Sequence, residues 1–109
     1  MTAQILIAES EAQFQARLIE YAISRGWEWM HIGRTGKYSA NGAKGTLGTG
    51  WPDLTLVRGP RLIFAELKSQ KAPPPPLEQQ HVLLRLSEVG VETYHWRPSD
   101  WPMILEVLL

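Results

Sequence analysis

Apolar residues near the start of the chain recur with a helical period. Between Phe14 and Ala22 they return every three or four positions, which is the spacing of one face of an α-helix. Ser10, followed three residues later by Gln13, is a capping-box pattern that marks a helix start. Gly26 ends the run, because glycine is favoured just beyond a helix C-terminus. The pattern therefore predicts a helix over residues 10–25.

The middle of the chain has strand-like patterning. Residues 27–32 form one run, and Leu54–Val57 and Leu62–Ala65 form two more that flank the turn residues 58–61. If this hairpin pivots between its glycine and its proline, residues at equal distance from the pivot face each other. Asp53 and Glu66 are such a pair, so the register predicts two opposed carboxylates at the open end of the hairpin.

The second half of the chain alternates once more between the two periods. The four prolines of residues 72–76 predict a stiff, extended connector, and Leu77–Val89 resumes helical spacing up to a glycine. Residues 91–96 read as a strand. Ser99 or Asp100 is expected to cap a last helix, with a proline tolerated in its first turn. The predicted order is helix, three strands, helix, strand, helix.

Composition indicates one globular domain spanning residues 1–109. The 109 residues are 44% hydrophobic, which is enough for a single core. The absence of cysteine excludes disulfides and thiolate sites, and the three histidines lack zinc-ligand spacing. No apolar run reaches the length of a membrane span and no secretion signal is evident, so a cytoplasmic location is expected.

Charge is unevenly distributed although its net value is zero. Residues 34–71 hold seven of the eleven basic residues and two of the eleven acids, which gives this segment a charge of +5. Part of it is a glycine-rich basic loop at about residues 33–50, and loops of this length in a small domain usually have a function. A basic face that attracts a polyanion such as DNA is therefore expected.

The two acids of this basic segment form the candidate site. Alternation along the strand places Lys68 on the same face as Glu66, so Asp53, Glu66 and Lys68 converge. One interpretation is a strand end with solvated charges. The other is a site for a hard divalent cation such as Mg²⁺, since opposed like charges are destabilising without a cation.

These residues also resemble a known signature. Pro52-Asp53 followed by Glu66-Leu67-Lys68 resembles the PD-(D/E)XK nuclease superfamily, and Gly50-Trp51-Pro52-Asp53-Leu54 is similar to its VRR-NUC branch. Glu11, Gln79 and the ending His95–Pro98 resemble further positions of that branch. The resemblance covers roughly residues 9–109. It implies an α/β (α+β) fold, the restriction-endonuclease-like αβββαβα core with a central mixed sheet flanked by helices.

The resemblance also implies roles for the residues of the site. Asp53, Glu66 and the main-chain carbonyl of Leu67 would hold Mg²⁺ or Mn²⁺, with Lys68 beside the metal-bound water and the phosphate. Gln79 would orient that water or Lys68, with Gln80 as a solvated neighbour.

Glu11 has two interpretations. From the pattern alone it is a favourable charge at a helix N-terminus, whereas the resemblance implies a metal ligand acting directly or through water. Glu9 is the alternative ligand.

The activity that the resemblance implies is Mg²⁺-dependent DNA endonuclease action on branched substrates such as Holliday junctions, by a homodimer in a bacterial or phage-infected cell. A phosphate-binding loop for a nucleotide cofactor is not expected, because the segment around Lys44 lacks the required ending. Trp51 either stacks on a base or buttresses the turn.

The alternatives to a nuclease are a non-catalytic nucleic-acid-binding module of the same fold and a proline-rich interaction protein. The residues expected to contact nucleic acid are Arg34, Lys37, Lys44, Trp51, Arg58, Arg61 and Lys71.

Overall fold

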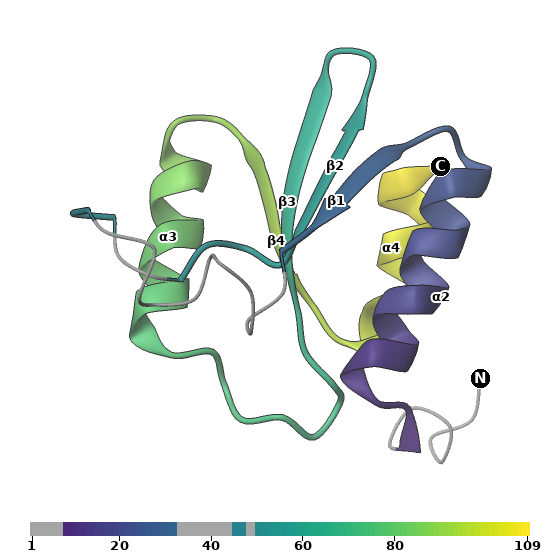
Figure 1. The fold of residues 1–109 in the computed structure, drawn as a ribbon, viewed down its shortest axis with the longest axis horizontal. Coiled ribbons are helices and arrows are strands. Elements are labelled where there is room, and N and C mark those ends of the chain that lie inside the picture. Colours follow the sequence, from purple (N-terminus) through teal and green to yellow (C-terminus); the bar gives the residue numbers. More distant parts are fainter. Residues whose placement is uncertain (1–7, 33–44, 48–49) are drawn as a thin grey trace.

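The computed structural model describes residues 8–32, 45–47 and 50–109 of the chain. Its elements follow the predicted order of helix, three strands, helix, strand and helix (Figure 1). They are α2 (Glu11–Ser24), β1 (Glu28–His31), β2 (Leu54–Arg58), β3 (Arg61–Leu67), α3 (Leu77–Glu88), β4 (Glu92–Trp96), the 3-10 turn η1 (Pro98–Asp100) and α4 (Trp101–Leu108).

The four strands form one mixed sheet in the order β1-β2-β3-β4. The first three strands are antiparallel neighbours, whereas β3 and β4 run parallel. A parallel pair needs a crossover connection, and here the connection contains α3. The predicted α/β fold with a central mixed sheet flanked by helices is therefore confirmed.

The start of α2 has the predicted capping box. The Gln13 amide donates a hydrogen bond of 3.0 Å to Ser10 Oγ, and the Ser10 amide donates one of 2.8 Å to Gln13 Oε1. Two amide groups that would lack partners at a helix start are thereby satisfied.

The hairpin has the predicted register, because Leu54 pairs with Ala65 and Arg58 pairs with Arg61. Its turn passes through Gly59, whose φ is 56°, a left-handed conformation that glycine adopts without steric cost. Strand β3 is longer than predicted and continues to Leu67. The extra residues bring Glu66 into the sheet.

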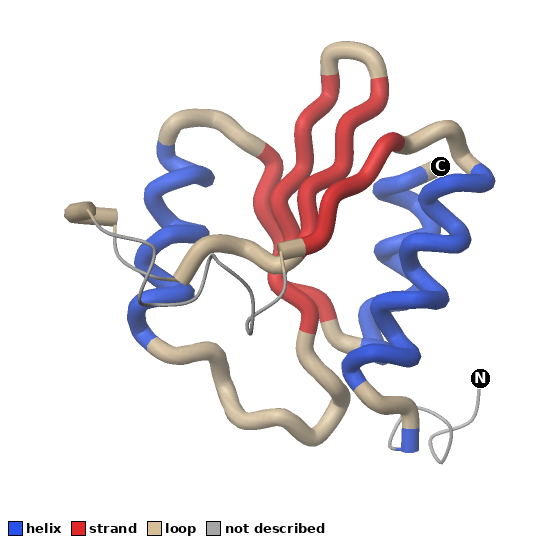
Figure 2. Tube along the Cα trace, viewed as in Figure 1, coloured by secondary structure: helices blue, strands red, loops and turns tan. Residues whose placement is uncertain are grey.

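Helices α2 and α4 cover one face of the sheet, and α3 lies on the other side (Figures 1 and 2). Side chains of β2 and β3 that point toward α2 and α4 are fully buried, as at Leu54, Leu56, Ile63 and Ala65. On the opposite face Val57 and Leu62 are exposed. The main core therefore lies on the face away from α3. It comprises Phe14, Leu18, Ile19, Ala22, Trp27, Leu54, Leu56, Ile63, Ala65, Leu67, Trp96, Ile104 and Leu108.

The last helix differs from its prediction at its start. The predicted cap residue Asp100 makes no side-chain hydrogen bond to the amides of α4. Its carboxylate accepts a bond of 2.8 Å from the Arg97 amide, which closes the 3-10 turn that precedes α4. The helix itself begins with Pro102 in its first turn, as predicted.

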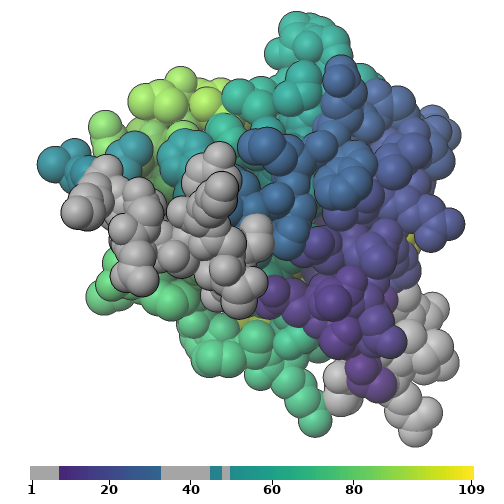
Figure 3. All heavy atoms as spheres, viewed as in Figure 1, coloured from purple at the N-terminus to yellow at the C-terminus, as the bar shows by residue number. Residues whose placement is uncertain are grey.

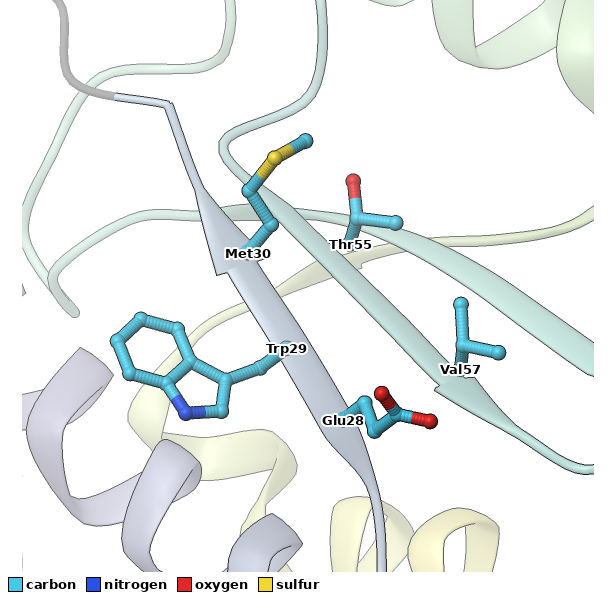
Figure 4. Close-up of a pocket in the computed structure, with 5 residues that line it drawn as sticks. All are labelled: Glu28, Trp29, Met30, Thr55 and Val57. Carbon is cyan, nitrogen blue, oxygen red and sulfur yellow. The ribbon is translucent and has the colours of Figure 1, made fainter.

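Strand β1 lies at the edge of the sheet, and all its residues are exposed. Figure 3 shows it at the molecular surface beside α2. A hollow of about 230 Å³ lies over β1 and β2, lined by Glu28, Trp29, Met30, Thr55 and Val57 (Figure 4). None of the described helices is long and apolar enough to cross a membrane.

Candidate active site

The predicted pair of opposed carboxylates is present at the open end of the hairpin. Asp53 directly precedes β2, and Glu66 is the next residue of β3 beyond the last registered pair. The Asp53 amide donates to Glu66 Oε1 at 3.2 Å, and the Leu67 amide donates to Asp53 Oδ2 at 3.3 Å. Asp53 is 5% exposed and Glu66 is 0% exposed. The interpretation of this site as a strand end with solvated charges is therefore wrong, because both acids are buried.

Lys68 joins the two acids, as strand alternation predicted. Its Nζ lies 3.5 Å from Glu66 Oε2, and the residue is 7% exposed. The Lys68 amide donates a hydrogen bond of 3.1 Å to the Trp96 carbonyl, which ties the end of β3 to the end of β4. Buried charges of this kind are costly to desolvate, so this cluster is not explained by stability alone.

The donor set at the acid pair fits a hard divalent cation. Mg²⁺ is usually held by one or two carboxylates together with waters and substrate phosphates. The Leu67 amide points to Asp53, and the carbonyl of a strand residue lies along the same strand edge as its amide. Asp53, Glu66 and the Leu67 carbonyl are therefore the groups of this chain that could hold the ion.

Glu11 is not brought into that set. It occupies the first position of α2 and is partly buried. The described part of the chain contains no group of three histidine, cysteine or acidic side chains placed to share a metal. Glu9, the alternative ligand, is paired with Arg17, because its carboxylate accepts two hydrogen bonds from the Arg17 guanidinium at 2.9 and 2.8 Å. A metal-linked role for Glu11 stays a prediction.

Gln79 lies in the first turn of α3, directly against the segment that leads to Asp53. A Cβ placed on the buried Gly50 would lie 2.6 Å from the Gln79 backbone nitrogen and Cα. The side-chain Oε1 of Gln79 is buried and accepts no hydrogen bond from the described residues. The neighbouring Gln80 is exposed and donates to the Pro75 carbonyl at 2.7 Å. Of the two glutamines, Gln79 is therefore the one with a buried side-chain oxygen, and its role in orienting water or Lys68 stays a prediction.

Sequence reasoning missed His95 as a residue of this neighbourhood. Parallel pairing of β3 and β4 places His95 directly beside Glu66. Burial lowers the pKa of His95, and the positive charges of Arg97 and Lys68 lower it further. The strand containing His95 was predicted, but its register against β3 is a tertiary feature without a local sequence signal.

The residues expected to contact nucleic acid divide into four groups, of which Arg58 and Arg61 form the last. Trp51 is 41% exposed and packs edge-on against Phe64, with ring centroids 5.4 Å apart, so it does buttress the sheet beside the site. Lys71 is exposed just after β3. Arg34, Lys37 and Lys44 lie outside the described residues.

The structure does not bring Arg58 and Arg61 to the acid pair, because they flank the turn at the opposite end of the hairpin. Arg58 donates to the carbonyls of Arg25 and Leu108 at 3.0 and 3.2 Å. Arg61 forms a two-bond pair with Glu92 at 2.9 and 2.7 Å. Both guanidinium groups are thus engaged within the chain.

A solved structure of another protein has a fold similar to that of this chain. No family model and no curated protein matches the sequence. A solved structure described as "VRR_NUC domain" matches with a TM-score of 0.68 at 20% sequence identity. The match covers 91% of this chain and 97% of that chain. The chain therefore has the fold of the VRR_NUC domain over nearly its whole length, as the sequence motifs predicted.

Proposed function

We propose that this chain, which has the fold of a VRR_NUC domain, is a Mg²⁺-dependent DNA endonuclease. The observation that carries the proposal is the buried convergence of Asp53, Glu66 and Lys68 at adjoining strand ends. Two opposed buried acids with a lysine beside them are unfavourable for stability alone, since like charges repel and buried charges lose their hydration. Two carboxylates with a lysine beside them form a donor set suited to a divalent cation and a phosphodiester.

Each residue has a separate role in the proposed hydrolysis. A bound Mg²⁺ or Mn²⁺ supplies Lewis acidity and lowers the pKa of water at the site. Asp53, Glu66 and the Leu67 carbonyl bind the ion. Lys68 orients the attacking water or offsets the negative charge that develops on the phosphate. Gln79 positions that water or the Lys68 ammonium from the first turn of α3.

The two alternatives explain less of the structure. A non-catalytic nucleic-acid-binding module does not require a buried acid pair with a lysine. A proline-rich interaction protein would present residues 72–76 as a free ligand. Instead, the Arg97 guanidinium donates to the carbonyls of Ser69, Ala72 and Pro73 at 2.7, 2.9 and 3.3 Å. These bonds tie the connector to the end of β4, and they favour a structural role for it.

The substrate is proposed to be branched DNA, cut by a homodimer. Resolving a four-way junction requires two nicks in opposed strands, and a two-fold dimer supplies two related active sites. Cleavage of labelled linear, flap and four-way-junction DNA in Mg²⁺ tests both the activity and its preference. Junction cleavage faster than linear cleavage is the expected result, and equal rates would contradict the preference.

Substitution of the acids tests the site itself. Asp53→Asn and Glu66→Gln keep side-chain shape but remove a ligand charge, so each should reduce cleavage by at least about 100-fold while leaving the fold intact. Glu20→Gln and Glu106→Gln, at exposed positions on α2 and α4, are matched controls that should cleave at the wild-type rate. Near wild-type cleavage by either site variant would falsify the assignment.

A further inference from the structure

One face of the sheet gathers four polar side chains at the ends of β3 and β4. Glu66 and His95 are direct neighbours in the parallel register, so their side chains leave the sheet on the same side. Lys68 and Arg97 each follow two residues later and return to that side. Trp96, between His95 and Arg97, is 1% exposed and belongs to the core on the other face. His95 therefore stands on the catalytic face next to the proposed metal ligand.

The imidazole of His95 has an unused hydrogen-bonding atom. Its Nε2 is buried, and no described residue forms a hydrogen bond with it. Buried polar atoms in proteins are nearly always paired with protein groups or ordered water. An atom in this position at a candidate active site indicates that a further group belongs beside it.

The Lys68 ammonium is the complementary group. It has three N–H donors, and its contact with Glu66 Oε2, at 3.5 Å, uses one direction. Lys68 follows Glu66 by two residues, so it lies diagonally across the β3–β4 pair from His95, on the same face of the sheet. No direct bond joins the two side chains, so a water between them would give each a partner. Such a water would also hold the ammonium in a fixed direction.

We propose that His95 is a positioning residue of this site, whose Nε2 accepts a hydrogen bond from an ordered water bound to the Lys68 ammonium. Lys68 would then be held from two sides, by Glu66 and by the water on His95. This inference rests on the proposed nuclease function, because the ammonium must be fixed in order to act on the attacking water or the phosphate. His95 itself does not touch the reacting atoms.

Two substitutions separate positioning from packing. His95→Phe keeps an aromatic ring but removes the acceptor, whereas His95→Gln keeps a polar atom near the position of Nε2. We expect His95→Phe to lower kcat by about 10- to 100-fold with little change in the KM for DNA, and His95→Gln to recover most of that loss. His81→Phe, at an exposed histidine of α3, is the matched control and should leave kcat unchanged.

Thermal unfolding distinguishes this role from a structural one. His95 is only partly buried, and its Nε2 forms no hydrogen bond to the described residues, so an apolar ring of similar shape breaks no protein–protein bond at that atom and should leave the melting temperature close to that of wild type. Slow cleavage by a variant that is at least as stable as wild type therefore supports positioning. His95→Phe cleavage within two-fold of wild type, or equal losses in both variants together with lower stability, would overturn the inference.

A crystal structure tests the inference without relying on activity. The wild-type protein should show an ordered water within hydrogen-bond distance of both Lys68 Nζ and His95 Nε2, and His95→Phe should lose it. Absence of that water in the wild type overturns the inference even if cleavage is observed. If the water is present but no DNA substrate is cut, the proposed nuclease function fails while the His95–Lys68 bridge stands.

Discussion

Gly50 shows how one residue joins two parts of the candidate site. It lies in the segment leading to Asp53, and its backbone touches the first turn of α3, where Gln79 lies. Any larger residue would place its Cβ 2.6 Å from backbone atoms of that helix. Backbone cannot move aside as a flexible side chain can. Glycine therefore allows the close approach of the Asp53 segment and the helix that carries Gln79.

Gly50→Ala should displace α3 relative to Asp53. Overpacking of this kind costs about 1–3 kcal/mol of unfolding free energy, and we expect cleavage to fall by at least about ten-fold per folded molecule. Urea unfolding and single-turnover cleavage measure the two effects.

Gly59→Ala is the informative comparison. A Cβ at Gly59 meets open space, but its φ of 56° is unfavourable for alanine. The cost should be about 1–2 kcal/mol of stability, with no loss of cleavage per folded molecule. Equal effects of the two substitutions on cleavage would show that the Gly50 contact does not position the site.

At the scale of elements, an ion pair links β3 to β4 at the end away from the acid pair. Arg61 and Glu92 are joined by two hydrogen bonds, and the Tyr94 hydroxyl donates a third to Glu92 at 3.1 Å. The hydrogen bonds from Arg61 hold the pKa of Glu92 below its ordinary value. A carboxylate with a lowered folded-state pKa stabilises the fold above its unfolded-state pKa.

Glu92→Gln should therefore destabilise the protein at neutral pH and have little effect in acid. The pair is partly exposed, with side-chain exposures of 37% for Arg61 and 34% for Glu92, so the expected loss at pH 7 is about 1 kcal/mol. The difference from wild type should shrink as pH falls below about 4.3, the ordinary pKa of glutamate, and through the lower folded-state value. Urea unfolding at pH 7 and at pH 3 measures it. A difference independent of pH would contradict the argument.

Also at the scale of elements, the basic residues Arg58 and Lys71 differ in their surroundings. Arg58 bonds to the ends of α2 and α4, and its guanidinium lies 4.4 Å from the centre of the Trp27 ring. Lys71 is exposed four residues beyond the end of β3, the strand that carries the acid Glu66.

Arg58→Met and Lys71→Met should consequently behave in opposite ways. Lys71→Met should weaken DNA binding and reduce the slope of log affinity against log salt by about 1, with stability unchanged. Arg58→Met should cost about 1–2 kcal/mol of stability with the slope unchanged. Affinity titrations at several salt concentrations, together with urea unfolding, test both. A reduced slope for Arg58→Met would instead assign that residue to the DNA surface.

At the scale of the whole molecule, two of the surfaces with exposed apolar residues are taken as candidate dimer surfaces. Helix α4 and the residue after it carry apolar side chains at Trp101, Met103, Leu105, Leu108 and Leu109. Leu108 is buried in the core, but Met103 and Leu109 are 52% and 67% exposed. The edge strand β1 offers a second surface, where Trp29 and Met30 are 48% and 56% exposed.

The proposed homodimer can be tested by placing a charge on each surface. Met103→Glu should dissociate a dimer formed through α4, and Met30→Glu should dissociate one formed through β1, because a buried unpaired charge is unfavourable. Light scattering at micromolar concentration reports the mass. Junction cleavage by mixtures of wild-type and Asp53→Asn subunits reports whether both sites are required. A wild-type protein that remains monomeric would rule out this version of the function.

Local sequence patterns were sufficient to predict the helices and strands and the opposed pair of acids. The capping box, the glycine stops and the period-two runs are short-range features, since each depends on residues a few positions apart. The hairpin register is also local, because its short turn determines which residues face each other. For this reason the opposition of Asp53 and Glu66, and the place of Lys68 beside Glu66, followed from the sequence.

Contacts between distant segments required the tertiary structure. The place of His95 beside Glu66 depends on the register of a parallel pair that is joined through α3, and no turn links the two strands directly. The engagement of Arg58 and Arg61 depends in the same way on where α4 and β4 pack. The charge pattern of the sequence shows that an arginine is present, but it does not show which group its guanidinium binds. Side-chain partners across the sheet are set by packing among distant elements, and a local pattern does not encode that packing.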